Sequence, residues 1–108
     1  MPGKAEVFER KRLIRVTLIK RAMDRKTIHY GELGRIVGMP AQGPWKNILD
    51  EIAKEETSQG RPDFTYLVIS RQSGLPGQIG YQPAKPPTPD QRKMADDEIN
   101  RVFDYYRL

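Results

Sequence analysis

The chain has 108 residues, a net charge of +5 and no cysteine, which indicates one small domain without disulfides, thiolate metal sites or thiol nucleophiles. No run approaches the roughly 18 apolar residues of a membrane span. Because Arg10, Lys11 and Arg12 interrupt the apolar run near the N-terminus, no secretory signal is visible. We therefore expect a cytoplasmic protein without a membrane partner.

The positive charge is concentrated at one end of the chain. Residues 1–26 contain nine Lys and Arg against three Asp and Glu, whereas residues 27–108 are slightly acidic. A concentrated basic face suits a polyanionic partner better than an evenly mixed surface does.

The first predicted element is a long helix over about residues 5–25. Its apolar positions recur near helical spacing: Val7, Phe8, Leu13, Ile14, Leu18, Ile19, Ala22 and Met23. Arg12, Arg15 and Lys20 lie off this stripe. Two compatible interpretations stay open, a solvated face of a core-packing helix and a basic face that contacts DNA phosphates.

A short extended segment at residues 27–28 precedes a second helix, predicted over residues 30–37. Leu33, Ile36 and Val37 are expected to point inward. Gly38 is a natural helix stop, and the turn to residue 44 is rich in breakers. His29, the only histidine, is interpreted as a surface or capping residue.

A third helix is predicted from Pro44 or Trp45 to Ser58. Its apolar arc holds Trp45, Ile48, Leu49, Ile52 and Ala53. The opposite arc holds Lys46, Asn47, Asp50 and Lys54. In a recognition helix, Lys46 would contact phosphate or guanine and Asn47 would pair with adenine. The acidic balance of this helix, and Asp50 within the outward arc, argue against entry into a groove.

Residues 64–70 are predicted to form a strand, because they are aromatic and β-branched without a breaker. Residues 71–77 would form a wing tip, and residues 79–81 the returning strand of a hairpin. Arg71 on this wing is expected to touch phosphates.

Residues 82–89 contain four prolines and are interpreted as a spacer, with a proline-rich ligand as the alternative. A last helix, capped by Thr88 or Asp90, is predicted to run to about Tyr106. Its apolar side chains could dock it onto the domain or pair it with a second chain: Met94, Ile99, Val102, Phe103 and Tyr106.

Motifs of catalysis are absent from the sequence. It has no Walker loop, dinucleotide fingerprint, HExxH or EF-hand pattern, and its serines lack a His–Asp partner set. The paired acids, such as Asp50 with Glu51, are typical of solvated helix faces. We expect no enzyme activity, no cofactor and no metal.

The run Tyr30-Gly31-Glu32-Leu33-Gly34 resembles the Tyr-Gly-x-Leu-Ala segment in the DNA-binding domain of alkylguanine-DNA alkyltransferases and alkyltransferase-like proteins. The resemblance covers about residues 5–81 and implies a winged-helix fold. It further implies that Tyr30 helps to rotate a target nucleotide. In the family an arginine on the recognition helix fills the gap that the nucleotide leaves, and Lys46 falls near the position of that arginine if the turn is two residues longer here.

Two departures from this family bear on chemistry. Gly34 replaces the usual alanine, and the Pro-Cys-His-Arg active-site motif is missing, with no tryptophan in the place of its cysteine. The resemblance therefore implies a fold that faces DNA and does not support alkyl transfer. A degenerate alkyltransferase-like activity is the weaker alternative.

The sequence thus predicts an α+β winged helix-turn-helix with a long N-terminal helix, a β-hairpin wing and a C-terminal helix. Its expected divisions are a winged-helix domain (1–81), a Pro-rich linker (82–89) and the C-terminal helix (90–108). The expected function is non-catalytic binding of double-stranded DNA. The expected contacts are Tyr30, Lys46, Asn47, Lys54, Arg71, Arg12 and Arg15.

Alternative functions come from other classes. One is a winged-helix protein-interaction module or dimerising accessory protein, with a protein partner or second copy bound through the C-terminal helix. The other is an accessory or inhibitor that mimics part of a DNA-repair domain.

Overall fold

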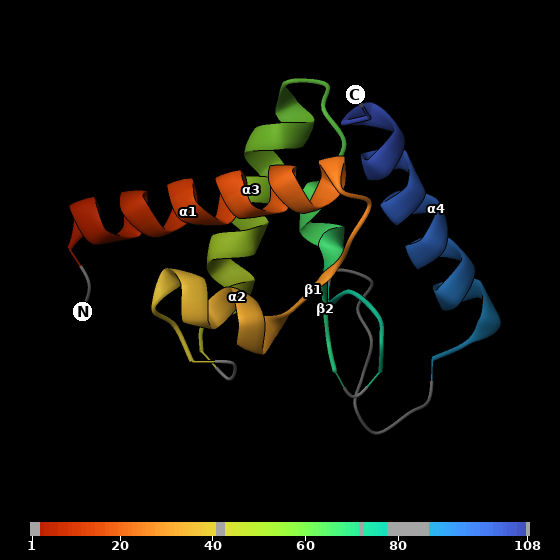
Figure 1. Cartoon of the computed structure of the whole chain (residues 1–108), viewed down its shortest axis with the longest axis horizontal. Coiled ribbons are helices and arrows are strands. Elements are labelled where there is room, and N and C mark those ends of the chain that lie inside the picture. The colour runs from red at the N-terminus through yellow and green to blue at the C-terminus, as the bar shows by residue number, and fades with distance from the viewer. Residues whose placement is uncertain (1–2, 41–42, 72, 78–86, 108) are drawn as a thin grey trace.

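The computed structural model describes residues 3–40, 43–71, 73–77 and 87–107 (Figure 1). This part of the chain is α+β, as predicted. Its elements in chain order are α1 (Lys4–Met23), β1 (Ile28–His29), α2 (Tyr30–Val37), α3 (Trp45–Ser58), the 3-10 helix η1 (Phe64–Leu67), β2 (Val68–Ile69) and α4 (Pro89–Tyr105).

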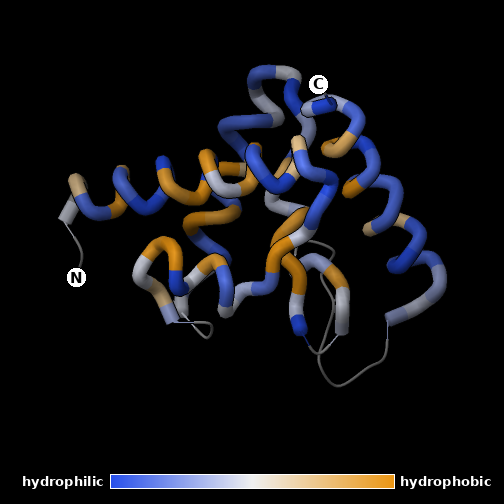
Figure 2. Tube along the Cα trace, in the orientation of Figure 1, coloured by the Kyte–Doolittle hydropathy of each residue, from blue (hydrophilic) through white to orange (hydrophobic). Residues whose placement is uncertain are grey.

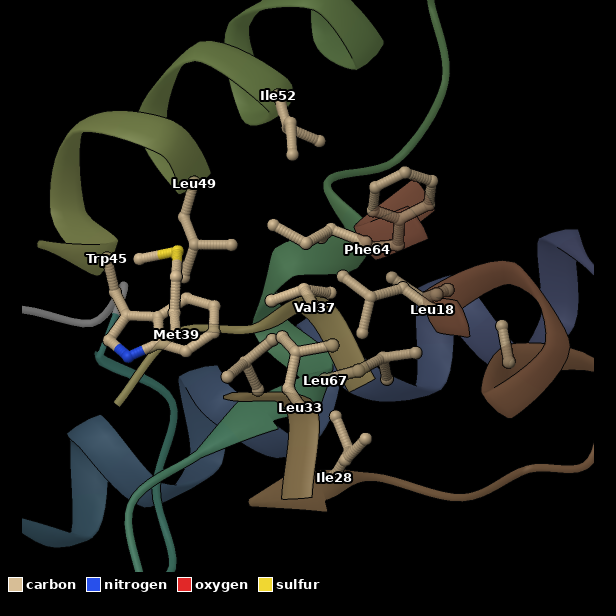
Figure 3. Close-up of a cluster of buried hydrophobic side chains, with 14 of the residues drawn as sticks. Leu18, Ile28, Leu33, Val37, Met39, Trp45, Leu49, Ile52, Phe64 and Leu67 are labelled. Carbon is tan, nitrogen blue, oxygen red and sulfur yellow. The ribbon is translucent and has the colours of Figure 1, made fainter. Parts of the chain in front are cut away.

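The core lies where α1, α2, α3 and η1 meet. On α1, Ile14, Leu18 and Ala22 recur every four residues and are fully buried, as the period of a helix requires. Figure 3 shows side chains of these elements pointing toward one another, and Figure 2 shows apolar residues gathered along the same inner faces. The labelled side chains of Figure 3 are Leu18, Ile28, Leu33, Val37, Met39, Trp45, Leu49, Ile52, Phe64 and Leu67.

The predicted stop of α2 is confirmed. Gly38 has a φ of 79°, in the left-handed region that glycine adopts without strain. Its N–H and that of Met39 both donate to the carbonyl of Gly34, at 2.8 and 2.9 Å, which closes the end of the helix. The prediction that Ile36 points inward is wrong, because this side chain is exposed.

The predicted strand over residues 64–70 is wrong for its first half, which is η1. The Asp63 carboxylate caps this turn by accepting a hydrogen bond from the Thr65 N–H at 2.9 Å. Phe64, Thr65 and Leu67 are all buried, and only Tyr66 is partly exposed, so buried residues do not alternate with exposed ones along this segment. A 3-10 turn brings residues i and i+3 together and suits this pattern better than the alternation of a strand.

The strand that remains, β2, pairs in parallel with β1, with Ile28 opposite Val68 and His29 opposite Ile69. An antiparallel bridge joins Ile69 to Pro76. The turn between them is closed by hydrogen bonds from the Ser70 N–H to the Leu75 carbonyl (3.0 Å) and from the Gly74 N–H to the Ser70 carbonyl (2.8 Å). We define residues 70–77 as the β2 turn. The predicted return strand, residues 79–81, lies outside the described residues.

The last helix, α4, covers the core from the side of η1. Val102 and Phe103 are buried, and the Tyr106 ring lies 6.2 Å from the ring of Phe64. Met94, which was expected to dock, is exposed. Most of the predicted linker, residues 82–86, lies outside the described residues. The described contacts show α4 docked on its own chain.

Of the two predicted caps of the last helix, Thr88 is the one that the structure shows, and it forms a capping box with Gln91. The Gln91 N–H donates to the Thr88 hydroxyl at 3.1 Å, and the Thr88 N–H donates to the Gln91 side chain at 2.9 Å. Pro89 occupies the first turn, where a backbone N–H would have no acceptor within the helix, so the absence of this N–H costs no hydrogen bond.

Replacing Thr88 with alanine is expected to lower the free energy of unfolding by about 1 kcal/mol, because a helix N–H loses its acceptor. Urea denaturation followed by circular dichroism measures this change. Thr88→Ser keeps the hydroxyl and should retain most of the stability. Equal losses in both variants would contradict the capping role.

Candidate nucleic-acid interface

A network of ion pairs joins α1 to α3 along one edge of each helix. Lys11 Nζ lies 3.0 Å from Glu55 and 3.4 Å from Glu51. One turn further along α1, Arg15 binds both Glu55 and Glu56, the latter at 2.6 Å. The network therefore turns three of the four acidic residues of α3 toward α1.

Glu56 is the innermost member of this network, only 2% exposed. Arg61 donates to both of its carboxylate oxygens, at 3.0 and 2.9 Å, from the segment that follows α3. Burial raises the pKa of Glu56, but the hydrogen bonds from Arg61 and Arg15 outweigh it and hold the pKa below its usual value. Burial, with Glu56 nearby, also raises the pKa of Tyr106 to about 12.

The outward arc of α3 carries the residues predicted to meet DNA. Lys46, Asn47 and Lys54 are all exposed, and the side chain of Lys46 is 86% exposed. Lys46 Nζ lies 2.8 Å from Asp50, one turn along the helix. Lys54 forms no ion pair with any described residue. The outward arc therefore presents an unpaired cation (Lys54), a cation paired with Asp50 (Lys46) and an amide (Asn47).

Tyr30 lies at the junction of α2, α3 and the β2 turn. Its ring meets Trp45 edge-on, with centroids 5.7 Å apart. Burial raises the pKa of its hydroxyl, whereas the hydrogen bond with the backbone N–H of Gly77 lowers it and the charge of Asp50 raises it. A Cβ on Gly77 would lie 2.3 Å from the Tyr30 hydroxyl, so a larger residue there would displace the Tyr30 side chain. Tyr30 thus holds the β2 turn against α2; its contact with a nucleotide stays a prediction.

The three predicted arginines differ in their surroundings. Arg71 is exposed on the β2 turn. Arg12 is paired with Glu9, one turn earlier on α1. Arg15 belongs to the network with α3, so its charge is already balanced. Arg15 contacts the acidic residues of α3 and lies away from its outward arc. Phosphate contact by Arg12 and Arg15 stays a prediction.

Another basic surface, of which sequence reasoning selected only Lys20, surrounds a hollow of about 440 Å³ between α1 and α2. Lys20, Arg21 and Lys26 line it together with Val16, Thr17, Asp24 and Ile36. Arg21 contacts Glu32 at 3.4 Å, whereas Lys20 and Lys26 pair with no acid in the described part of the chain. Only the structure shows that the charges of Lys20 and Lys26 are unpaired among the described residues.

The remaining candidate chemistries have little support among the described residues. His29 Nδ1 lies 3.3 Å from Glu32, which lowers the pKa of that carboxyl. Among the residues that the structure describes, no group of three or more His, Cys, Asp or Glu side chains lies close enough together to hold a metal ion. Over the same residues, no helix combines the length and the apolar character that crossing a membrane requires.

Comparisons with family models, curated proteins and solved structures found no match.

Proposed function

We propose that this protein binds double-stranded DNA without catalysis, as a winged helix-turn-helix. The outward arc of α3 would face the groove, and the β2 turn would act as the wing on the backbone. The order helix, turn, helix and bridged turn supports this assignment. The observation that carries it is the separation of charge on α3.

The acids of α3 are the main objection to a recognition helix, since carboxylates repel phosphates. In the structure, Glu55 and Glu56 bind basic side chains of α1, and Glu51 lies 3.4 Å from Lys11. Asp50 alone shares the outward arc, where it pairs with Lys46. Because the acids are neutralised within the protein, the exposed arc that remains is mildly basic.

Each residue then has a physical role in the complex. Lys46 and Lys54 would bind phosphates, and Asn47 has the donor and acceptor pair that recognises adenine in the major groove. Arg71 would bind the backbone beside the wing. Tyr30 would position the β2 turn through Gly77. The free charges of Lys20 and Lys26 would raise the general attraction to a polyanion.

The proposal predicts a salt-dependent affinity for random-sequence duplex DNA, in the range of about 10⁻⁴–10⁻⁶ M typical of non-specific binding. Fluorescence anisotropy across a salt series measures it. Replacing both Lys46 and Lys54 with alanine removes two phosphate contacts. We expect the slope of log K against log salt to fall by about 2.

Lys93→Ala is the matched control. Lys93 has a 77% exposed side chain and pairs with Asp97 one turn along α4, as Lys46 pairs with Asp50 on α3. Its loss should leave the slope nearly unchanged. The absence of binding at low salt, or an equal effect from Lys93→Ala, would contradict the proposal. A protein-interaction module would then become the better assignment, because Phe8, Val16 and Ile36 are exposed apolar side chains.

A further inference from the structure

Two exposed apolar side chains lie among the cations of the hollow between α1 and α2. Val16 is 55% exposed and Ile36 is 47% exposed, and both line this hollow together with Lys20 and Lys26. Because residues four apart share one face of an α-helix, Val16 and Lys20 are neighbours along α1. Ile36 belongs to α2, which forms the other wall. Apolar and positively charged groups therefore share one concave surface.

The turn that follows α1 adds the second lysine to this surface. Arg25 has a φ of 55°, in the left-handed region that few side chains adopt, and its N–H donates to the Ala22 carbonyl at 3.1 Å. The Lys26 N–H donates to the Arg21 carbonyl at 2.8 Å, which completes a Schellman motif. The Arg25 guanidinium lies over the Phe103 ring, 5.2 Å from its centroid. The chain thus turns back at the helix end, and Lys26 joins the lining of the hollow.

The lysines of this hollow have charges that no side chain of the described residues balances. Lys20 and Lys26 are exposed, and neither pairs with an acid in the part of the chain that the structure describes. Arg21 contacts Glu32 at 3.4 Å, which holds its guanidinium at the edge of α2. Three basic side chains and one acid, Asp24, line the hollow, which gives the lining a net charge of +2. An anionic group with an apolar neighbour is the complement of this surface.

The hollow lies on the side of α1 that faces away from α3. Lys11 and Arg15 mark the face of α1 that contacts α3. At about 100° per residue, Val16 lies about 140° around the helix from Lys11, and Lys20 lies about 140° from Arg15. Among the described residues, none of α3 or of the β2 turn lines the hollow. The hollow is therefore separate from the surface proposed to face DNA.

We propose that this hollow binds a short acidic peptide segment of a partner protein. Its carboxylates would pair with Lys20 and Lys26, and an apolar side chain of the segment would pack between Val16 and Ile36. Such a segment complements both the charge and the exposed apolar surface. A duplex backbone would satisfy the lysines but has no apolar group for Val16 and Ile36, and Asp24 would repel its phosphates. Long-range attraction of DNA by the same lysines does not require that DNA occupy the hollow.

Selection of random linear peptides displayed on phage, with the full chain immobilised, tests the proposal. Enriched peptides should carry Asp or Glu beside an apolar residue, and labelled synthetic copies should bind in fluorescence anisotropy. Lys20→Glu combined with Lys26→Glu should raise their dissociation constant roughly tenfold or more, since like charges would then face each other. Arg92→Glu combined with Lys93→Glu is the matched control. Both residues are exposed on α4, so the same change of net charge there should leave the dissociation constant nearly unchanged.

Removal of the apolar surface separates a specific site from a general attraction to acids. Val16→Ser combined with Ile36→Ser keeps every charge of the hollow and should weaken the peptides several-fold. Circular dichroism shows that each variant is folded. Equal binding by this variant would overturn the inference. So would a selection without acidic peptides, or peptides whose affinity survives the charge reversal at Lys20 and Lys26.

Duplex DNA is the competing occupant of the hollow. A random-sequence duplex is added to the peptide complex of the variant with Lys46→Ala and Lys54→Ala, in which the outward arc of α3 has lost its cations. We expect the peptide to stay bound. Displacement would overturn the inference, because DNA would then occupy the hollow. Failure of the wild-type protein to bind DNA would instead contradict only the proposed function.

Discussion

Gly34→Ala is expected to destabilise the fold by roughly 3 kcal/mol, although alanine is the better helix former. A Cβ on Gly34 would lie 2.1 Å from the carbonyl oxygen of Met39 and 3.4 Å from the Trp45 ring. Met39 cannot easily retreat, because its side chain is buried and its N–H donates to the Gly34 carbonyl at 2.9 Å. Urea denaturation followed by Trp45 fluorescence measures the loss.

Gly31→Ala is the control within the same helix. A Cβ at Gly31 has no heavy atom within 4 Å, so this variant should be neutral or more stable by up to about 1 kcal/mol. Equal effects of the two substitutions would contradict the close approach of α2 to the α2–α3 turn. The short distance to Met39 gives a steric reason for glycine at position 34, where the sequence resemblance would expect an alanine.

Glu56→Gln is expected to cost roughly 2–3 kcal/mol of unfolding free energy. The neutral amide keeps the shape of Glu56 but leaves Arg15 and Arg61 without their shared charge. Breaking a fully buried pair costs about 3–5 kcal/mol, and the smaller figure follows because both arginines reach solvent. Glu55→Gln, at the exposed edge of the same network, should cost well under half as much. Thermal and urea denaturation of the two variants measure the losses, and a loss for Glu55→Gln equal to that for Glu56→Gln would contradict the prediction.

The same network gives the stability a dependence on pH. The pKa of Glu56 is lowered in the folded state, so its stabilisation is complete above the unfolded pKa, near 4.3. The stabilisation is lost as the pH falls through the lowered folded value. Asp63 acts in the opposite direction, because burial raises its pKa. Glu56→Gln should therefore flatten the fall in stability below about pH 5, and an unchanged profile would contradict this account.

The helices could be predicted because their signals are local. The apolar period and breakers predicted a start of α3 at Pro44 or Trp45 and an end at Ser58, and the cap of α4 at Thr88 or Asp90; the structure has Trp45–Ser58 and Thr88. The strand over residues 64–70 was partly wrong for the same local reason. Its aromatic and β-branched residues fit a strand, but contacts with α1, α3 and α4 bury three of the four residues of η1, and Asp63 caps a turn.

The candidate site shows the same limit. The 100° period placed Lys46, Asn47 and Lys54 on the outer arc, and they are exposed. Which basic residues pair with the acids of α3 depends on the helix that packs beside them, and no local sequence pattern contains that information. The same holds for the Tyr30 hydroxyl, whose partner Gly77 is distant in sequence.

The small sheet has a consequence for how the chain folds. Ile28 and Val68 are 40 residues apart in sequence, yet they are direct neighbours in the parallel ladder. Closing so long a loop loses entropy, and a ladder of two residues on each side cannot repay that loss alone. The ladder is therefore stable only when α2, α3 and η1, which lie within the loop, have already packed. We therefore expect this sheet to form late and the described elements from β1 to β2 to unfold as one cooperative unit.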